Sequence, residues 1–111
     1  MQVTISNEGA VTVVTPQGPI IANEMNVLEK QLDSLSRQGT GRIVISMNEA
    51  PFIDSAGLEL FLCYQRQLEK RGLKLKLSGL TDITQKIFDI TRLSRRFEIF
   101  ADTAGAVRSF L

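Results

Sequence analysis

Residues 42–58 read RIVISMNEAPFIDSAGL, and this stretch decides the fold. Its first part, residues 42–47, is almost continuously apolar, which is typical of a strand buried on both faces in the middle of a parallel sheet. Its last part carries Asp54, Ser55 and Gly57 directly before an apolar helical pattern, as expected where a helix begins. The stretch therefore predicts a central strand followed by a helix, with polar groups at the junction.

The N-terminal part of the chain predicts a hairpin and a helix. Residues 3–6 and 10–15 are rich in Val, Ile and Thr, and residues 7–9 between them form a turn signal, so we expect an antiparallel β-hairpin. Apolar residues then recur at steps of three and four, which indicates an amphipathic helix with Asn23 as its N-cap. The Gly-Thr-Gly segment at residues 39–41 is expected to end this helix.

The rest of the chain keeps alternating between helices and strands. The expected segments are, in order, a helix over residues 56–71, a strand with one apolar and one polar face over 73–77, a helix around 83–88 capped by Thr81 or Asp82, a short strand over 98–100 and a last helix capped by Asp102 or Thr103. Strands that alternate with helices pair in parallel through right-handed crossovers. The sequence therefore predicts a single α/β domain over residues 1–111, with an N-terminal antiparallel hairpin in a mixed β-sheet and helices packed on that sheet.

The composition excludes most familiar catalytic chemistry. The chain has 111 residues, no His and one Cys, so it lacks an imidazole base, a His metal ligand, an internal disulfide and a cysteine-based zinc site. We therefore expect no catalytic residue, no metal and no cofactor. Cys63 falls inside a predicted helix, where we expect a small buried hydrophobe.

The charge and the apolar runs exclude two classes of partner. Lys plus Arg number 13 and Asp plus Glu number 12, so the formal net charge is +1 and no basic excess exists to bind a nucleic acid. The N-terminal residues do not resemble a signal peptide, and no apolar run is long enough to span a membrane. We expect a cytoplasmic protein with no direct membrane insertion, as a monomer or a weak dimer.

The junction around Ser55 has two interpretations. In the simpler one, Asp54 or Ser55 caps the helix by accepting a hydrogen bond from an amide two or three residues on, and Gly57 permits close packing. In the other, Ser55 is a phosphorylation site. A phosphoryl group adds about −1.5 to −2 charges, which the helix dipole and the first amides would stabilise. Such a switch would leave its own scaffold intact.

Several motifs carry a resemblance to a known family. They are the motif Asp54-Ser55-x-Gly57-Leu58 between a buried strand and a long helix, the 73–77 strand with Ser78-Gly79 after it, and residues 87–93 and 97–100. In this order they resemble a STAS domain, and in particular the small bacterial anti-sigma factor antagonists. The similarity covers essentially the whole chain in order and length.

The resemblance implies a partner-switching function. In this family the Ser that follows Asp, here Ser55, is phosphorylated by a cognate anti-sigma factor that is also a serine kinase, and a metal-dependent serine phosphatase reverses the modification. The unphosphorylated antagonist binds the anti-sigma factor and releases the sigma factor, and phosphorylation abolishes that binding. The antagonist is then a substrate of the kinase and not an enzyme, and the ATP belongs to the kinase.

We expect the partner to dock on a surface around Ser55. The start of its helix, the 18–23 loop and the 78–82 loop should cluster there, because the carboxyl ends of parallel strands meet at one edge of a sheet. Phe52 and Ile53 are expected to pack below this surface. The contact residues expected around Ser55 are Asp54, Ala56, Gly57, Leu58, Glu59, Gly18, Ile21, Asn23, Ser78 and Gly79.

Three positions depart from the family pattern. Ile21 stands where many members have Asp, so any contact through that carboxylate is lost. Ser46 ends the buried strand, where members often have Asp or Asn. Glu59 replaces a residue that is commonly small and adds negative charge near Ser55, which bears on partner selectivity.

Two other functions stay open. A stand-alone STAS subunit of a membrane transporter, or a stressosome-type scaffold, has the same fold and needs no phosphate cycle. Transporter subunits often carry Thr where this chain has Ser55. A small enzyme is the remaining alternative, and the chain has no base in a recognisable catalytic arrangement.

Overall fold

The computed structural model describes residues 1–111. Its elements are β1 (Gln2–Glu8), β2 (Val11–Gln17), α1 (Asn26–Arg37), β3 (Ile43–Ser46), α2 (Ser55–Glu69), β4 (Lys76–Ser78), α3 (Asp82–Ile90), the 3-10 helix η1 (Leu93–Arg95), β5 (Glu98–Phe100) and α4 (Thr103–Arg108). This confirms the order of strands and helices expected from the sequence, with η1 as an addition. None of the helices is both long enough and apolar enough to cross a membrane.

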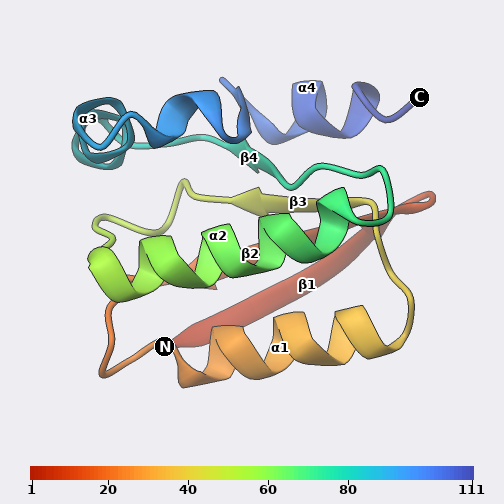
Figure 1. Ribbon diagram of the computed structural model, residues 1–111, viewed down its shortest axis with the longest axis horizontal. Helices are drawn as coiled ribbons and strands as arrows, with labels where there is room; N and C mark the ends of the chain where they lie inside the picture. Colours follow the sequence, from red (N-terminus) through yellow and green to blue (C-terminus); the bar gives the residue numbers. More distant parts are fainter.

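The strands form one sheet in the order β1-β2-β3-β4-β5 (Figure 1). β1 and β2 are antiparallel, whereas β2, β3, β4 and β5 pair in parallel with their neighbours. The mixed sheet with an N-terminal hairpin is therefore confirmed. Every residue of β3 is buried, because this strand lies in the middle of the sheet with helices on both faces. The apolar run that opens residues 42–58 is thus the centre of the fold.

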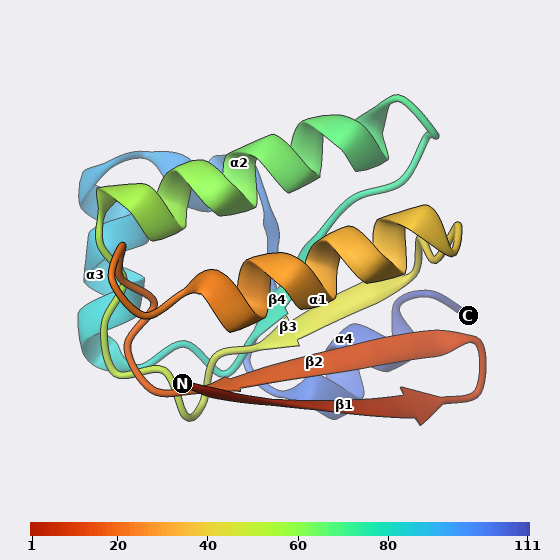
Figure 2. The ribbon, with the colours of Figure 1, turned by 90° about the horizontal axis from the view of Figure 1, so that it is seen from below.

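Helices cover both faces of the sheet. α1 and α2 lie side by side on one face, α4 lies on the other, and α3 stands at the end of the sheet where α1 and α2 begin (Figure 1 and Figure 2). The larger apolar core, under α1 and α2, includes Leu28, Leu32, Ile43, Ile45, Phe61 and Leu77. The smaller core, against α4, consists of Val11, Val13, Val44 and Ala106. Successive residues of β3 thus serve opposite faces, as the strand period of two requires.

The first helix begins later than the sequence predicts. α1 starts at Asn26 with Met25 in the N-cap position and no side-chain cap, so the assignment of Asn23 as the N-cap is wrong. Residues 22–24 form a turn instead, in which the amide of Glu24 donates to a carbonyl of the preceding loop. The chain is held in this turn because the loop before it is bonded to the segment that precedes α2.

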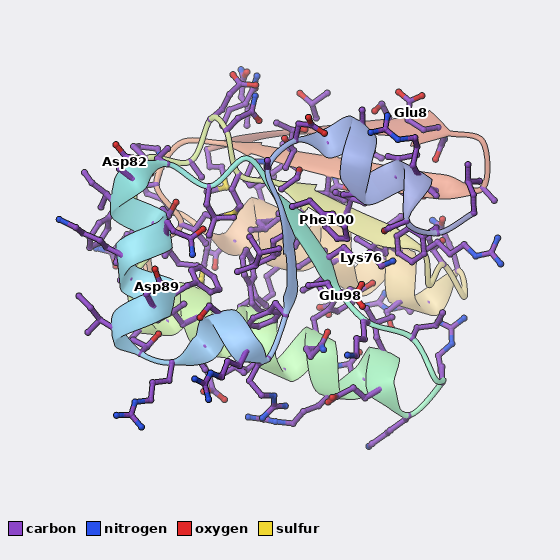
Figure 3. The ribbon with its side chains drawn as sticks, turned by 90° about the horizontal axis from the view of Figure 1, so that it is seen from above. Glu8, Lys76, Asp82, Asp89, Glu98 and Phe100 are labelled. Atoms are coloured by element: carbon purple, nitrogen blue, oxygen red, sulfur yellow. The ribbon has the colours of Figure 1, made fainter.

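β4 is shorter than the predicted strand, and its polar face is covered. The strand begins at Lys76, which is buried rather than solvated. Its ammonium lies 2.7 Å from Oγ of Ser109 and 3.2 Å from Oε2 of Glu98 (Figure 3). It also lies 3.9 Å from the centre of the Phe110 ring, a cation–π contact. The local alternation predicted a solvated face because the residues that cover Lys76 come from the far end of the chain.

Lys76→Ala is expected to lower the free energy of unfolding by about 2 kcal/mol, because it removes a hydrogen bond and a cation–π contact to the segment that ends α4, and a shielded ion pair to β5. Lys74→Ala removes an exposed lysine from the same segment and serves as the matched control, with an expected change below about 0.5 kcal/mol. Urea denaturation followed by circular dichroism measures both. Equal midpoints for the two variants would contradict the role assigned to Lys76.

Candidate functional site

Two loops meet in front of α2. The loop after β2 and the loop after β3 are joined by an isolated parallel bridge between Ile20 and Ile53. The amide of Ile20 donates to the carbonyl of Phe52 at 2.9 Å, and the amide of Asp54 donates to the carbonyl of Ile20 at 3.1 Å. Both loops follow the carboxyl ends of parallel strands, at the end of the sheet where α1 and α2 begin (Figure 2). The 18–23 loop therefore lies beside the start of α2.

The two carboxylate oxygens of Asp54 join the start of α2 to the 18–23 loop. Oδ1 accepts a hydrogen bond from the amide of Gly57 at 3.0 Å, which caps α2, and Oδ2 accepts one from the amide of Ala22 at 3.1 Å. The Gly57 amide, followed by the Ala22 amide, holds the pKa of the Asp54 carboxyl below its usual value of 3.8. Of the two cap candidates, Asp54 is therefore the cap, and Ser55 is the first residue of the helix.

Gly57 allows α2 to approach the bridge between the loops. A Cβ at this position would lie 2.6 Å from the carbonyl oxygen of Ile20 and 2.7 Å from Cγ1 of Ile53. Both distances are shorter than a van der Waals contact, and the carbonyl belongs to backbone that the bridge holds in place. A side chain at residue 57 would push the start of α2 away from the loops.

Ser55 occupies the first position of α2 and is exposed. The positive end of the helix dipole favours negative charge at this position. Glu59 lies one turn further along the same face of α2 and is also exposed. The hydroxyl of Ser55 is thus exposed at a helix end whose position is set by the neighbouring carboxylate.

The loop after β4 reaches the same end of the sheet. The amide of Met47 donates to the carbonyl of Ser78 at 2.7 Å. Gly79 has a φ of 64°, and a Cβ there would lie 3.2 Å from Cβ of Asn48. Ser78 itself is fully buried, and its hydroxyl oxygen is 2.9 Å from that of Thr103. The side chain of Ser78 is therefore not part of the exposed surface, because α4 covers it.

Ser46 links the end of β3 to two other segments. Its hydroxyl donates to Oδ1 of Asn48 in the following loop. It also accepts a hydrogen bond from the hydroxyl of Thr103, 3.2 Å away in α4. The neutral hydroxyl of Ser46 thus fixes the base of the loop without adding charge.

The expected contact residues differ in exposure. The exposed ones are Glu59 and Asn23; the partly buried ones are Asp54, Ala56, Gly18, Ile21 and Gly79; the buried ones are Gly57, Leu58 and Ser78. The structure thus brings all three predicted loops to one end of the sheet, and the buried residues support this surface from below.

Two side chains lie on the opposite side from the one expected. Phe52 is exposed, because Ile53 takes the inward position and neighbouring residues of an extended segment point to opposite sides. Cys63 is also exposed, since the inward face of α2 is filled by residues such as Phe61 and Tyr64. Both side chains therefore belong to the surface.

Comparisons with known proteins agree with this fold. The family model described as STAS domain matches residues 2–106. The anti-sigma-B factor antagonist of Bacillus subtilis (strain 168) is 32% identical over 91 residues, which are 82% of this chain and 83% of that protein. An anti-sigma factor antagonist from Mycobacterium paratuberculosis has a TM-score of 0.88 at 18% identity, over 97% of this chain and 92% of that one. The phosphorylated form of the Bacillus cell fate determinant SpoIIAA has a TM-score of 0.77 at 18% identity, over 99% and 100% of the two chains.

Gly57→Ala is expected to lower the free energy of unfolding by about 1–3 kcal/mol, because the new Cβ overlaps the Ile20 carbonyl. Gly105→Ala is the matched control. Gly105 also lies three residues after a capping Asp, but its Cβ would meet only side-chain atoms, the nearest at 3.1 Å. Thermal unfolding compares the two variants. A Gly57→Ala protein as stable as Gly105→Ala would show that the approach of α2 to the loops is not constrained.

Asp54→Asn is expected to lower stability in a pH-dependent way. The pKa of the Asp54 carboxyl is lower in the folded protein than its usual 3.8, so its contribution is complete above that value and is lost as the pH falls through the folded pKa. Asn can cap the helix through its oxygen, but its NH₂ group cannot accept the Ala22 amide. Urea midpoints measured from pH 7 to pH 2.5 should differ most at neutral pH and converge in acid. A difference that stays constant over this range would contradict the prediction.

Proposed function

Because the chain belongs to the STAS domain family, we propose that it is an anti-sigma factor antagonist that works by partner switching. Its unphosphorylated form binds an anti-sigma factor that is also a serine kinase, and the sigma factor is thereby released. Phosphorylation of Ser55 ends this binding, and a serine phosphatase restores it. The cycle takes place in the cytoplasm, and its ATP is bound by the kinase.

The observation that carries this proposal is the placement of Ser55. Its side chain is exposed at the first position of α2, at the end of the sheet where three loops gather. The preceding Asp54 carboxylate accepts two backbone amides, which position the serine and lower the pKa of the carboxyl, so Asp54 is a weak base. In the proposed reaction a base of the kinase takes the proton of the Ser55 hydroxyl. In this reaction the chain is a substrate and has no catalytic residue of its own.

The helix end explains how phosphorylation can act without unfolding the protein. A phosphoryl group adds about −1.5 to −2 charges, which the N-terminal end of α2 stabilises. The binding site of a kinase for Ser55 also holds the phosphates of its nucleotide. A phosphorylated Ser55 is repelled from such a site, whereas the neutral hydroxyl is accepted. The modification thus changes the affinity for the partner and leaves the scaffold in place.

The similarity to the Bacillus subtilis anti-sigma-B factor antagonist favours this function over a transporter subunit or a scaffold. The fold by itself does not distinguish these functions, because one fold can carry several. Phosphorylation of Ser55 distinguishes these functions in an experiment, because only the antagonist needs a kinase that modifies this residue.

The test is incubation with an anti-sigma factor serine kinase from the same organism and labelled ATP. Label is expected in the wild type and in Ser34→Ala, which removes an exposed serine from α1, and it should fall to background in Ser55→Ala. Ser55→Ala should remain bound to the kinase. Ser55→Asp should bind more weakly, though only in part, because Asp carries about one charge. The serine phosphatase should remove the label and restore binding.

Persistent labelling of Ser55→Ala would show that another residue accepts the phosphate. An absence of both binding and labelling in the wild type would overturn the partner-switching function for this chain.

A further inference from the structure

A groove between α1 and α2 opens beside the proposed phosphorylation site. Its volume is about 360 Å³, and it is lined by Met25, Glu29, Ala56, Glu59, Leu60 and Cys63. Ala56 directly follows Ser55, so the groove begins where the exposed serine is presented. It continues along α2 as far as Cys63, which is exposed.

The lining of this groove combines an apolar floor with an acidic rim. Met25, Ala56 and Leu60 are partly buried, which leaves apolar surface open to a partner. Glu29 on α1 and Glu59 on α2 are both exposed, and no basic residue lines the groove. A small apolar site with a few charged groups at its edge has the composition of a binding site for one side chain.

The acidic rim remains available to a partner. Glu59 has one basic neighbour, Arg66, at 3.7 Å, and both side chains are largely exposed. Exposed ion pairs of this kind contribute little and are screened by salt. The Glu59 carboxylate can therefore leave Arg66 and bind a cationic side chain of the partner instead.

The position of the rim relates it to the switch. Ser55 and Glu59 are spaced by one helical turn on the same face of α2, so a protein that covers Ser55 also covers the mouth of the groove. The phosphate would change the charge at the Ser55 end of this surface. The rim carboxylates lie further along the helix and keep their charge in both phosphorylation states.

We infer that this groove is a selectivity site for the anti-sigma factor kinase, and this rests on the function proposed above. It takes an apolar side chain of the kinase that is flanked by Lys or Arg, with the side chain on the Met25–Leu60 floor and the cations at Glu29 and Glu59. Charge complementarity of this kind selects among related partners more than it adds raw affinity. Ser55 decides when the partner binds, and the groove decides which partner binds.

The test measures the affinity of the kinase for variants of the groove. Glu59→Lys and Glu29→Lys should each weaken binding by about fivefold to tenfold, with a steeper effect at low salt. Glu8→Lys makes the same change of charge at the far end of the hairpin and should leave the affinity unchanged (Figure 3). Cys63→Phe fills the groove without changing its charge and should weaken binding by about tenfold.

The single cysteine provides an independent measurement. Cys63 of the free protein should react with N-ethylmaleimide, and the bound kinase should slow this reaction by at least about fivefold because it covers the groove. Intact-mass spectrometry of this chain follows the reaction without interference from cysteines of the kinase.

The outcomes separate the inference from the proposed function. If the kinase labels Ser55 but binds all groove variants as tightly as Glu8→Lys, the groove has no role and the switch stands. If Cys63 is protected by self-association of the free protein, seen by sedimentation, the occupant is a second copy and the inference is wrong. If the kinase neither binds nor labels the wild type, both proposals are overturned.

Discussion

The rest of the site depends on one carboxylate that joins two segments of the chain. Asp54 accepts the amide of Gly57 through one oxygen and the amide of Ala22 through the other, at 3.0 and 3.1 Å. The first contact fixes the start of α2, and the second fixes the loop after β2. The Ile20–Ile53 bridge joins the same two segments, and α2 can approach it closely because residue 57 has no side chain. The position of Ser55 follows from these three constraints.

This arrangement suits a residue that is acted on by another protein. A nucleophile that performs its own chemistry needs an effective base beside it, whereas two backbone amides lower the pKa of the carboxylate next to Ser55 and make it a weak base. What the surroundings of Ser55 supply is exposure, a rigid helix end and a dipole that tolerates added negative charge. The groove along α1 and α2 extends the same surface with apolar and acidic groups. In the proposed function, the switch at Ser55 and the partner preference of the groove therefore occupy adjoining parts of one helix.

Much of the fold was predictable because its signals are local. This holds for the apolar run of β3, for the hairpin and for the helical spacing of α2. In each case the sequence pattern within one element shows which of its side chains are buried. The cap at Asp54 was also predictable, as one of two neighbouring candidates. Asn23 failed as a cap because the loop that contains it is bonded to Asp54, a contact between residues far apart in the sequence. Cys63 and Phe52 were placed inside because apolar character alone does not tell which face of an element meets the core.

The sequence by itself determined the order of the elements, the central strand and the serine that follows the capping Asp, because each depends on neighbouring residues or on a short period. Tertiary structure alone decided the second contact of Asp54, the burial of Lys76 and Ser78 under α4, and the groove between α1 and α2. The Ala22 amide carries no signal in the sequence, since every residue except proline has a backbone donor. Contacts of this kind depend on how distant segments pack, and packing is settled only when the whole chain has folded.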